Sequence, residues 1–288
     1  MTIRTFDAPS AGPVVMHVTS SVGKVRAIVD SRLRHARVTV ETTEDSGRYA
    51  EAVAATDFAE EQVNHGRRVR VTVPEVRPVI RRHDGASYSS GGSTYHFGDT
   101  VTFAGGMNFG SVSGIRTTPD GDVFIGDQKI VQDGRVVADK GTTVGGRTST
   151  ITVTVRLPRD CALQLSTNSA DLEVVGDLAA VGVTSISGDV ELNGAVGWLT
   201  VNTTSGDVVA ERIARSASHS AVSGSLEVLA YSGEAFESAS ATGHIRVTAT
   251  PVASGTLRAR SISGDVVTSG AWHLDLRTSS MTGRTRNR

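Results

Sequence analysis

The stretch Ile186-Ser187-Gly188-Asp189-Val190 contains a short phrase that returns through the second half of the chain. Each full copy places a hydroxyl-bearing residue before a glycine, and the copies are centred on Gly188, Gly206, Gly224, Gly243, Gly264 and Gly283, with a degenerate copy centred on Ala170. The centres are separated by 18, 18, 18, 19, 21 and 19 residues. Self-similarity at a fixed short period predicts a solenoid, in which each repeat forms one coil.

The residues around each glycine form columns that alternate between apolar and polar. Two residues after the glycine stand Leu172, Val190, Val208, Leu226, Ile245 and Val266, and four residues after it stand Val174, Leu192, Ala210, Val228, Val247 and Thr268. Two residues before it stand Asn168, Ile186, Thr204, Val222, Ala241, Ile262 and Met281. A spacing of two residues is strand alternation, so the pattern excludes helix and predicts that all three columns face a shared core.

One coil of this length buries too few apolar side chains to fold alone, so the coils must stack. We therefore predict an all-β protein whose second half is a single-chain parallel β-solenoid, similar to a β-helix, with coils of about 18–21 residues. Ala217 and His219 stand at positions where the other coils have larger or more apolar residues, which predicts a thin or partly hydrated place in the core. The tail, Arg284–Arg288, has two interpretations, a charged terminator of the stack or a frayed end.

The first half is predicted to be a different β region. Four segments alternate like strands, namely Val14–Val18, Gly23–Val29, Ala36–Thr42 and Val69–Val73. The sequence around Gly23 echoes the repeated phrase, which suggests that the ladder of coils begins near the N-terminus. Residues 49–62 are rich in alanine and glutamate and predict one short helix.

Residues 77–149 are expected to form an insertion rich in glycine loops and β-hairpins. Turn signals at Asp120-Gly121, Gly126-Asp127 and Asp133-Gly134 separate short apolar runs, as in a meander. The predicted organisation is therefore an N-terminal β region over residues 1–76, this insertion over 77–149, and solenoid repeats over 150–288. Loops on such scaffolds often carry binding, and the candidate binding loop contains His83, Asp84, Tyr88, Tyr95, His96 and Phe109.

Composition narrows the choice of partners and compartment. The net charge is −1, which gives no electrostatic reason to expect nucleic acid. The single cysteine, Cys161, stands in an apolar stretch and is expected to be a small buried hydrophobe. The start of the sequence lacks the apolar stretch of a secretory signal and no run could span a membrane, so a cytoplasmic protein is the default expectation.

The chain also resembles a known family. The strand ending in Val69-Arg70-Val71-Thr72-Val73-Pro74, the later strand Ile151–Pro158 and the Ser-Gly-Asp-Val coils that follow resemble the bacterial family labelled "putative adhesin", a domain of unknown function with β-strand repeats. The resemblance implies a solenoid without an established enzymatic activity, sometimes associated with the cell envelope. The insertion over residues 77–149 departs from the plainer family pattern.

The repeat turns are the other candidate site, formed by Gly188, Asp189, Gly206, Asp207, Gly224, Gly243, Gly264 and Asp265. Stacked aspartates could bind a cation such as calcium, but Ser225 and His244 interrupt the column, which favours solvated turn acids. His83, Asp84 and His96 are the best remaining metal or acid–base candidates, yet no motif supports a zinc centre. We therefore assign no catalytic residue, cofactor or metal.

Two classes of function remain. The first is a non-catalytic scaffold that binds a protein or a polysaccharide, and its edge strands would also allow a homo-oligomer. The second is a carbohydrate-active enzyme, because some β-helices are lyases or hydrolases that use carboxylates in a groove. Coils of 18 residues and few aromatic side chains favour the first class.

Overall fold

The computed structural model describes residues 1–63, 66–76 and 150–288, together with the backbone of eight short strands between residues 87 and 136. The chain divides into two compact units, one made of Met1–Val76 and Ser149–Arg288 and the other of Arg77–Thr148. The first unit contains the repeats. The described residues include no helix with the length and hydropathy needed to cross a membrane.

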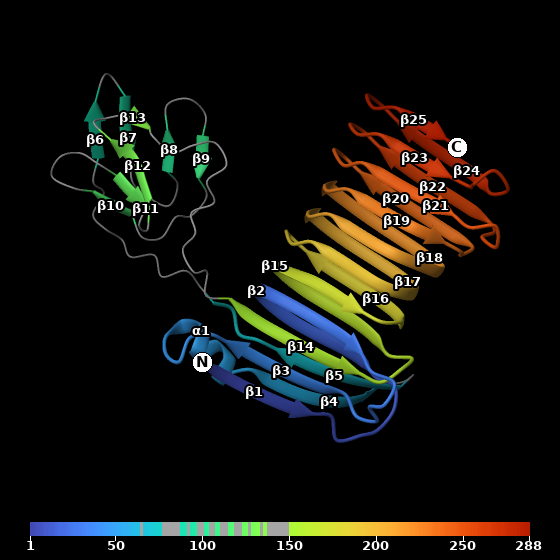
Figure 1. The fold of residues 1–288 in the computed structure, drawn as a ribbon, viewed down its shortest axis with the longest axis horizontal. Coiled ribbons are helices and arrows are strands. Elements are labelled where there is room, and N and C mark those ends of the chain that lie inside the picture. The colour runs from blue at the N-terminus through green and yellow to red at the C-terminus, as the bar shows by residue number, and fades with distance from the viewer. Residues whose placement is uncertain are drawn as a thin grey trace. The chain divides into compact units, whose positions relative to one another are not determined.

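The repeats form the predicted parallel β-solenoid (Figure 1). Its strands are β15 (Ala162–Val175), β16 (Leu178–Ser185), β17 (Val190–Ser205), β18 (Val208–Ser223), β19 (Leu226–Tyr231), β20 (Ala235–Ser240), β21 (Ile245–Ala249), β22 (Thr256–Ser261), β23 (Val266–Ser269), β24 (Asp275–Ser280) and β25 (Thr285–Asn287). Every pairing among them is parallel. Each coil therefore adds one strand's width to the stack, about 4.8 Å.

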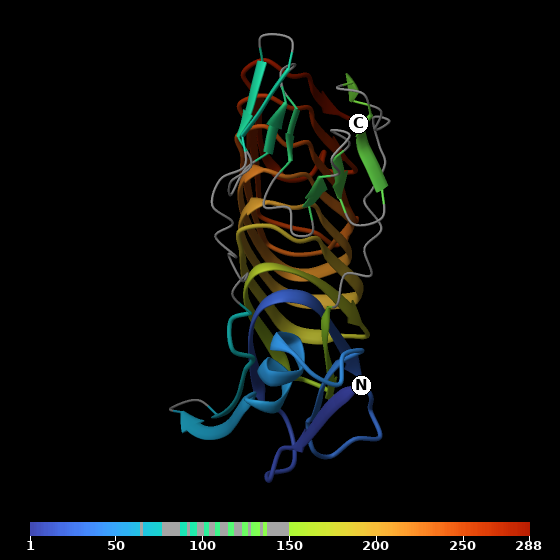
Figure 2. The same ribbon diagram turned by 90° about the vertical axis from the view of Figure 1, so that its left-hand side faces the viewer.

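The coils have two faces, and Figure 2 shows the chain turning from one face to the other within each coil. Face 1 carries a ladder that runs from Leu163 through Val181 and Leu199 to β18, β20, β22 and β24. Face 2 carries the ladder of Leu172, Val190 and Val208, which continues through β19, β21, β23 and β25. The repeated glycines lie at the corner between the end of face 1 and the start of face 2, which we call the glycine corner.

The N-terminal region begins the same stack. β2 (Val15–Val29) pairs in parallel with β15, and Gly23 lies opposite Ala170, as the echo in the sequence predicts. Beyond β2, face 2 continues in β14 (Ile151–Leu157), β3 (Arg37–Thr42) and β1 (Thr2–Asp7). Face 1 continues in β5 (Gly66–Thr72) and β4 (Asp57–Val63). The β1–β3–β14 and β4–β5 pairings are antiparallel, so the stack ends in hairpin-like pairings rather than in another coil.

The helix predicted over residues 49–62 is half wrong. Helix α1 covers only Arg48–Ala54, and the hydroxyl of Thr56 donates to the carbonyl oxygen of Ala52 at its C-terminal end. Residues from Asp57 onward form β4, which pairs along its whole length with β5. Cross-strand pairing therefore overrides the helix propensity of the alanine and glutamate residues there.

The two columns that follow each glycine belong to the core, and their members are almost completely buried. The column two residues before the glycine was predicted to face the core and does not. Ile186, Val222 and Ile262 are each more than half exposed. The residue three positions before the glycine faces inward instead, and it is a small residue in every coil, namely Thr167, Ser185, Thr203, Ala221, Ser240, Ser261 and Ser280.

The coil that contains Ala217 and His219 was predicted to be thin or partly hydrated, but both residues are buried. Ala217 and His219 are 5% and 2% exposed. His219 Nδ1 and the hydroxyl of Ser238 in the next coil are 3.0 Å apart, whereas Nε2 has no hydrogen-bond partner among the described residues. Cys161 is also buried as expected, and the backbone N–H of Val14 donates to its sulfur at 3.3 Å.

The last residues form a paired strand. β25 pairs with β23, and Arg288 donates its backbone N–H to the carbonyl oxygen of Thr268. The hydroxyl of Thr268 donates to Asn287 at 2.7 Å, so a polar residue stands in a column that is apolar in earlier coils. The last described residues are therefore a paired, polar strand rather than a frayed end.

The second unit is a set of hairpins. β6 (Ser87–Ser90) pairs with β7 (Ser93–His96), and β8 (Val101–Phe103) pairs with β9 (Met107–Phe109). β10 (Ile115–Thr117), β11 (Val123–Ile125), β12 (Gln128–Gln132) and β13 (Arg135–Val136) form the antiparallel meander that the turn signals predict.

Candidate functional site

The glycine corner is built on direct backbone contact between coils. A Cβ atom added at Gly188 would lie 2.5 Å from the carbonyl oxygen of Ala170, and one added at Gly206 would lie closer still to the carbonyl oxygen of Gly188. The same approach recurs at Gly224, Gly243 and Gly264. Gly188 and Gly206 also have positive φ angles of 121° and 131°. The coils centred on Gly188, Gly206, Gly224, Gly243 and Gly264 therefore require glycine at this position, for space and in the first two also for backbone conformation.

The residue after each glycine ties its coil to the next. Asp171 Oδ1 accepts the backbone N–H of Asp189 at 3.0 Å, Asp189 Oδ1 accepts that of Asp207 at 2.9 Å, and Asp207 Oδ1 accepts that of Ser225 at 2.7 Å. The ladder continues where the aspartates stop, because His244 Nδ1 accepts the N–H of Asp265 at 2.9 Å. These acids were expected to be solvated turn residues, but one oxygen of each is used in stacking.

The side chains before the glycines line the corner with hydroxyl groups. The backbone N–H of Ser187 donates to the carbonyl oxygen of Asn168 at 2.7 Å, and its side-chain oxygen lies 3.4 Å from the same atom. Ser205 and Thr242 repeat this arrangement on the carbonyl oxygens of Ile186 and Val222. The hydroxyls are thus held in register, one per coil.

These residues line a shallow, open groove of about 590 Å³, which we call the corner groove. It is lined by Ser169, Asp171, Ser187, Gly188, Asp189, Ser205, Gly206, Asp207, Ser223, Gly224, Ser225, Thr242 and Gly243. The floor is concave because the glycines have no side chains. Gly264 and Asp265 belong to the same columns but lie beyond the groove lining.

A row of exposed apolar residues, which we call the apolar ridge, directly precedes the hydroxyl residues of the glycine corner in the sequence of each coil. It consists of Ile186, Val222, Ile262 and Met281, whose side chains are 53–79% exposed, with Thr204 and Ala241 between them. Strand alternation alone misses the ridge because the chain turns at the glycine, where inward positions such as Ser185 and Val190 stand five residues apart. The sequence feature that could have predicted the ridge is the column of small residues three positions before each glycine, which face inward.

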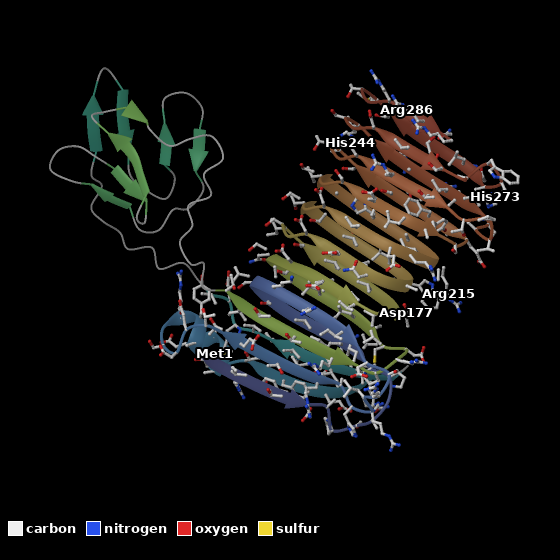
Figure 3. All side chains as sticks on the ribbon, viewed as in Figure 1. Met1, Asp177, Arg215, His244, His273 and Arg286 are labelled. Carbon is white, nitrogen blue, oxygen red and sulfur yellow. The ribbon has the colours of Figure 1, made fainter. Side chains whose placement is uncertain are left out.

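The charge of the groove is not neutralised by neighbouring side chains. No ion pair between described residues involves Asp171, Asp189 or Asp207. Figure 3 shows His244 at the glycine corner and Asp177, Arg215 and His273 along the opposite corner of the coils. Within the described residues, no group of three or more His, Cys, Asp or Glu side chains could hold a metal ion.

The candidate binding loop lies outside the residues whose side chains the structure describes. The backbones of Tyr88 and Tyr95 are directly opposite each other in the β6–β7 hairpin, and Ser87 lies opposite His96. His83 and Asp84 fall outside the described residues, and Phe109 is placed only as part of β9. The role of this loop stays a prediction.

A stack of parallel coils around one apolar core defines a single-chain β-solenoid protein. The chain belongs to the Toastrack DUF4097 family, whose sequence profile matches residues 120–283. No curated protein matches the chain.

Three solved structures that are similar to this chain come from bacteria. A "putative adhesin" from Bacteroides fragilis is 15% identical with a TM-score of 0.42, covering 100% of this chain and 97% of its own. One from Parabacteroides distasonis is 10% identical with a TM-score of 0.42, covering 99% and 97%. A "putative cell adhesion protein" from Clostridium sporogenes is 7% identical with a TM-score of 0.37, covering 99% and 96%.

Proposed function

We propose that the protein is a non-catalytic β-solenoid scaffold that binds an extended ligand, a protein segment or a polysaccharide, along the corner groove. The observation that carries this proposal is the repetition of the same polar groups in successive coils of one groove. Because the coils are about 4.8 Å apart, the groove presents hydroxyls and carboxylates in a row along the solenoid axis. A linear polymer with repeated hydrogen-bond donors matches such a row.

The geometry of the carboxylates argues against a glycoside hydrolase. Such enzymes place two carboxyl groups on opposite sides of the scissile bond. Asp171, Asp189 and Asp207 instead form one column on one side of the groove, and each uses an oxygen to hold the next coil. All three acids hold neighbouring coils together, so their place in the column has a structural reason. This arrangement supports a groove that binds a ligand rather than one that cleaves it.

The test compares two sets of Asp→Asn substitutions on a panel of polysaccharides and extended peptides. The triple variant Asp171→Asn, Asp189→Asn and Asp207→Asn keeps the oxygen that accepts each backbone N–H and removes the charge. The control is Asp177→Asn, because Asp177 Oδ1 accepts the N–H of Ala195 at 2.8 Å on the opposite corner. The triple variant should lose binding while the control retains it.

Two results would overturn the proposal. Release of new sugar ends from any polysaccharide would assign the protein to the carbohydrate-active enzymes. Full binding by the triple variant, combined with loss of binding when residues 83–115 are deleted, would move the site to the candidate binding loop.

A further inference from the structure

The solenoid carries its charge unevenly along its axis. Residues 161–240 contain ten acidic residues and two arginines, a net charge of −8. Residues 241–288 contain seven arginines and two aspartates, a net charge of +5. The last coils are therefore a basic end on a solenoid whose preceding coils are acidic, and the overall net charge of −1 conceals this end.

The basic end also carries the most exposed tryptophan. Trp272 is 88% exposed and Val252 is 75% exposed, and both lie in turns at the corner opposite the corner groove. His273 Nε2 donates to the carbonyl oxygen of Ala253 at 3.0 Å, which ties the two turns together on neighbouring coils. Figure 3 shows His273 at this corner. Two large apolar side chains are thus held in solvent by a backbone that is itself well anchored.

Arginines continue the surface beside these turns. Arg258 and Arg277 are register partners on β22 and β24, so two like charges stand on adjacent strands of face 1. Arg277 pairs with Asp275 at 3.3 Å and Arg260 pairs with Glu237 at 3.6 Å. Arg258 has no ion pair among the described residues. The fold gives no partner to this charge, and a negatively charged surface would supply one.

We propose that Val252, Arg258, Arg260, Trp272 and Arg277, here called the Trp272 patch, dock on the surface of an anionic phospholipid bilayer. Exposed tryptophan prefers the interfacial layer of a membrane, where the ring contacts acyl chains and the indole N–H reaches the hydrated headgroups. Arginines beside it are attracted to anionic headgroups within a Debye length. Val252 and Trp272 are both strongly exposed in turns, which suits contact with a flat surface.

The proposal concerns surface binding only, and it is independent of the corner groove. Two acids of face 1 beside the Trp272 patch, Glu237 and Asp275, are paired with its arginines, and Glu234 is a further exposed acid at this corner. The patch keeps one unpaired arginine and shares its coils with Arg284, Arg286 and Arg288, which are all exposed.

The experiment measures sedimentation of the full chain with vesicles of phosphatidylcholine alone and with vesicles that also contain phosphatidylglycerol. Binding should require phosphatidylglycerol and weaken as salt is added. Arg258→Gln should lower the partition coefficient about fivefold, from the attraction of one basic residue to such a surface. Trp272→Ser should lower it about tenfold. Arg212→Gln is the matched control, because Arg212 is exposed on the acidic coils and should not contribute.

A second measurement follows the indole directly. Trp198→Phe leaves Trp272 as the single tryptophan of the chain, and its emission should shift to shorter wavelength when phosphatidylglycerol vesicles are added. Equal binding to both kinds of vesicle, or no spectral shift, would overturn the proposal. Tight binding to double-stranded DNA in place of vesicles would also overturn it and assign the patch to a soluble polyanion.

Discussion

Acid should weaken the solenoid at His219, and the size of the effect follows from its burial. His219 is 2% exposed, and desolvation lowers its pKa from 6.5 to about 4. The folded protein therefore keeps a neutral imidazole at pH values where the unfolded chain is protonated. Stability is lost as the pH falls below 6.5, and the loss is complete near pH 4. From these two pKa values, folding should be about 2 kcal/mol less favourable at pH 5 than at pH 8 through this residue alone.

The measurement is urea unfolding of the native protein and of His219→Gln at both pH values. Glutamine offers the hydroxyl of Ser238 a hydrogen-bond partner but does not titrate, so the other ionisable groups cancel in the comparison. Trp198 is a suitable reporter because it lies on β17, which pairs with β18, the strand that carries His219. His35→Gln is the control, since His35 is exposed. If the native protein and His219→Gln lose the same stability between pH 8 and pH 5, the assignment of a neutral buried imidazole is wrong.

Two further predictions concern the glycine corner. Gly206→Ala should destabilise the protein by about 3 kcal/mol, from a strained φ angle and a collision with the carbonyl oxygen of Gly188; Gly182→Ala, where the nearest atom is Gln164 Cγ at 3.8 Å, should be nearly neutral in the same thermal unfolding assay, and equal effects would contradict the stacking argument. Asp189→Ala should cost about 1 kcal/mol because the backbone N–H of Asp207 loses its acceptor, whereas Asp189→Asn should cost little. Equal unfolding free energies for the two Asp189 variants would show that the charge, not the acceptor, matters.

The sequence carries the fold well wherever one coil resembles the next. Val190, Val208 and Leu226 fall into a single buried ladder because a repeated backbone brings the same position of each coil to the same place. The prediction fails where a local rule is applied across a turn. Ile186 and Val222 share the two-residue alternation of Val190 and Leu226 in the sequence, but the chain changes direction at the glycine and their side chains point into solvent.

Other features depend on contacts that no local pattern contains. Residues 57–62 look helical because of their composition, and only the partner strand β5 makes them extended. The surface formed by the arginines of the basic end also depends on the fold, because these residues lie on adjacent strands only after the chain has coiled. A count of charge along the sequence shows the excess, but the pairing of Arg258 with Arg277 requires the register of β22 and β24.

The candidate site follows from a requirement of the fold itself. Successive coils approach so closely at the glycine corner that no side chain fits between Gly188 and Gly206, and the absence of side chains makes the surface concave there. The polar side chains on either side are then fixed by bonds to neighbouring coils, as Asp189 is by the N–H of Asp207. The substitutions that would fill the groove are therefore those that the stack cannot accept. This coupling explains why charge is the property to change in a binding test, since Asp→Asn alters what the groove presents without altering how the coils stack.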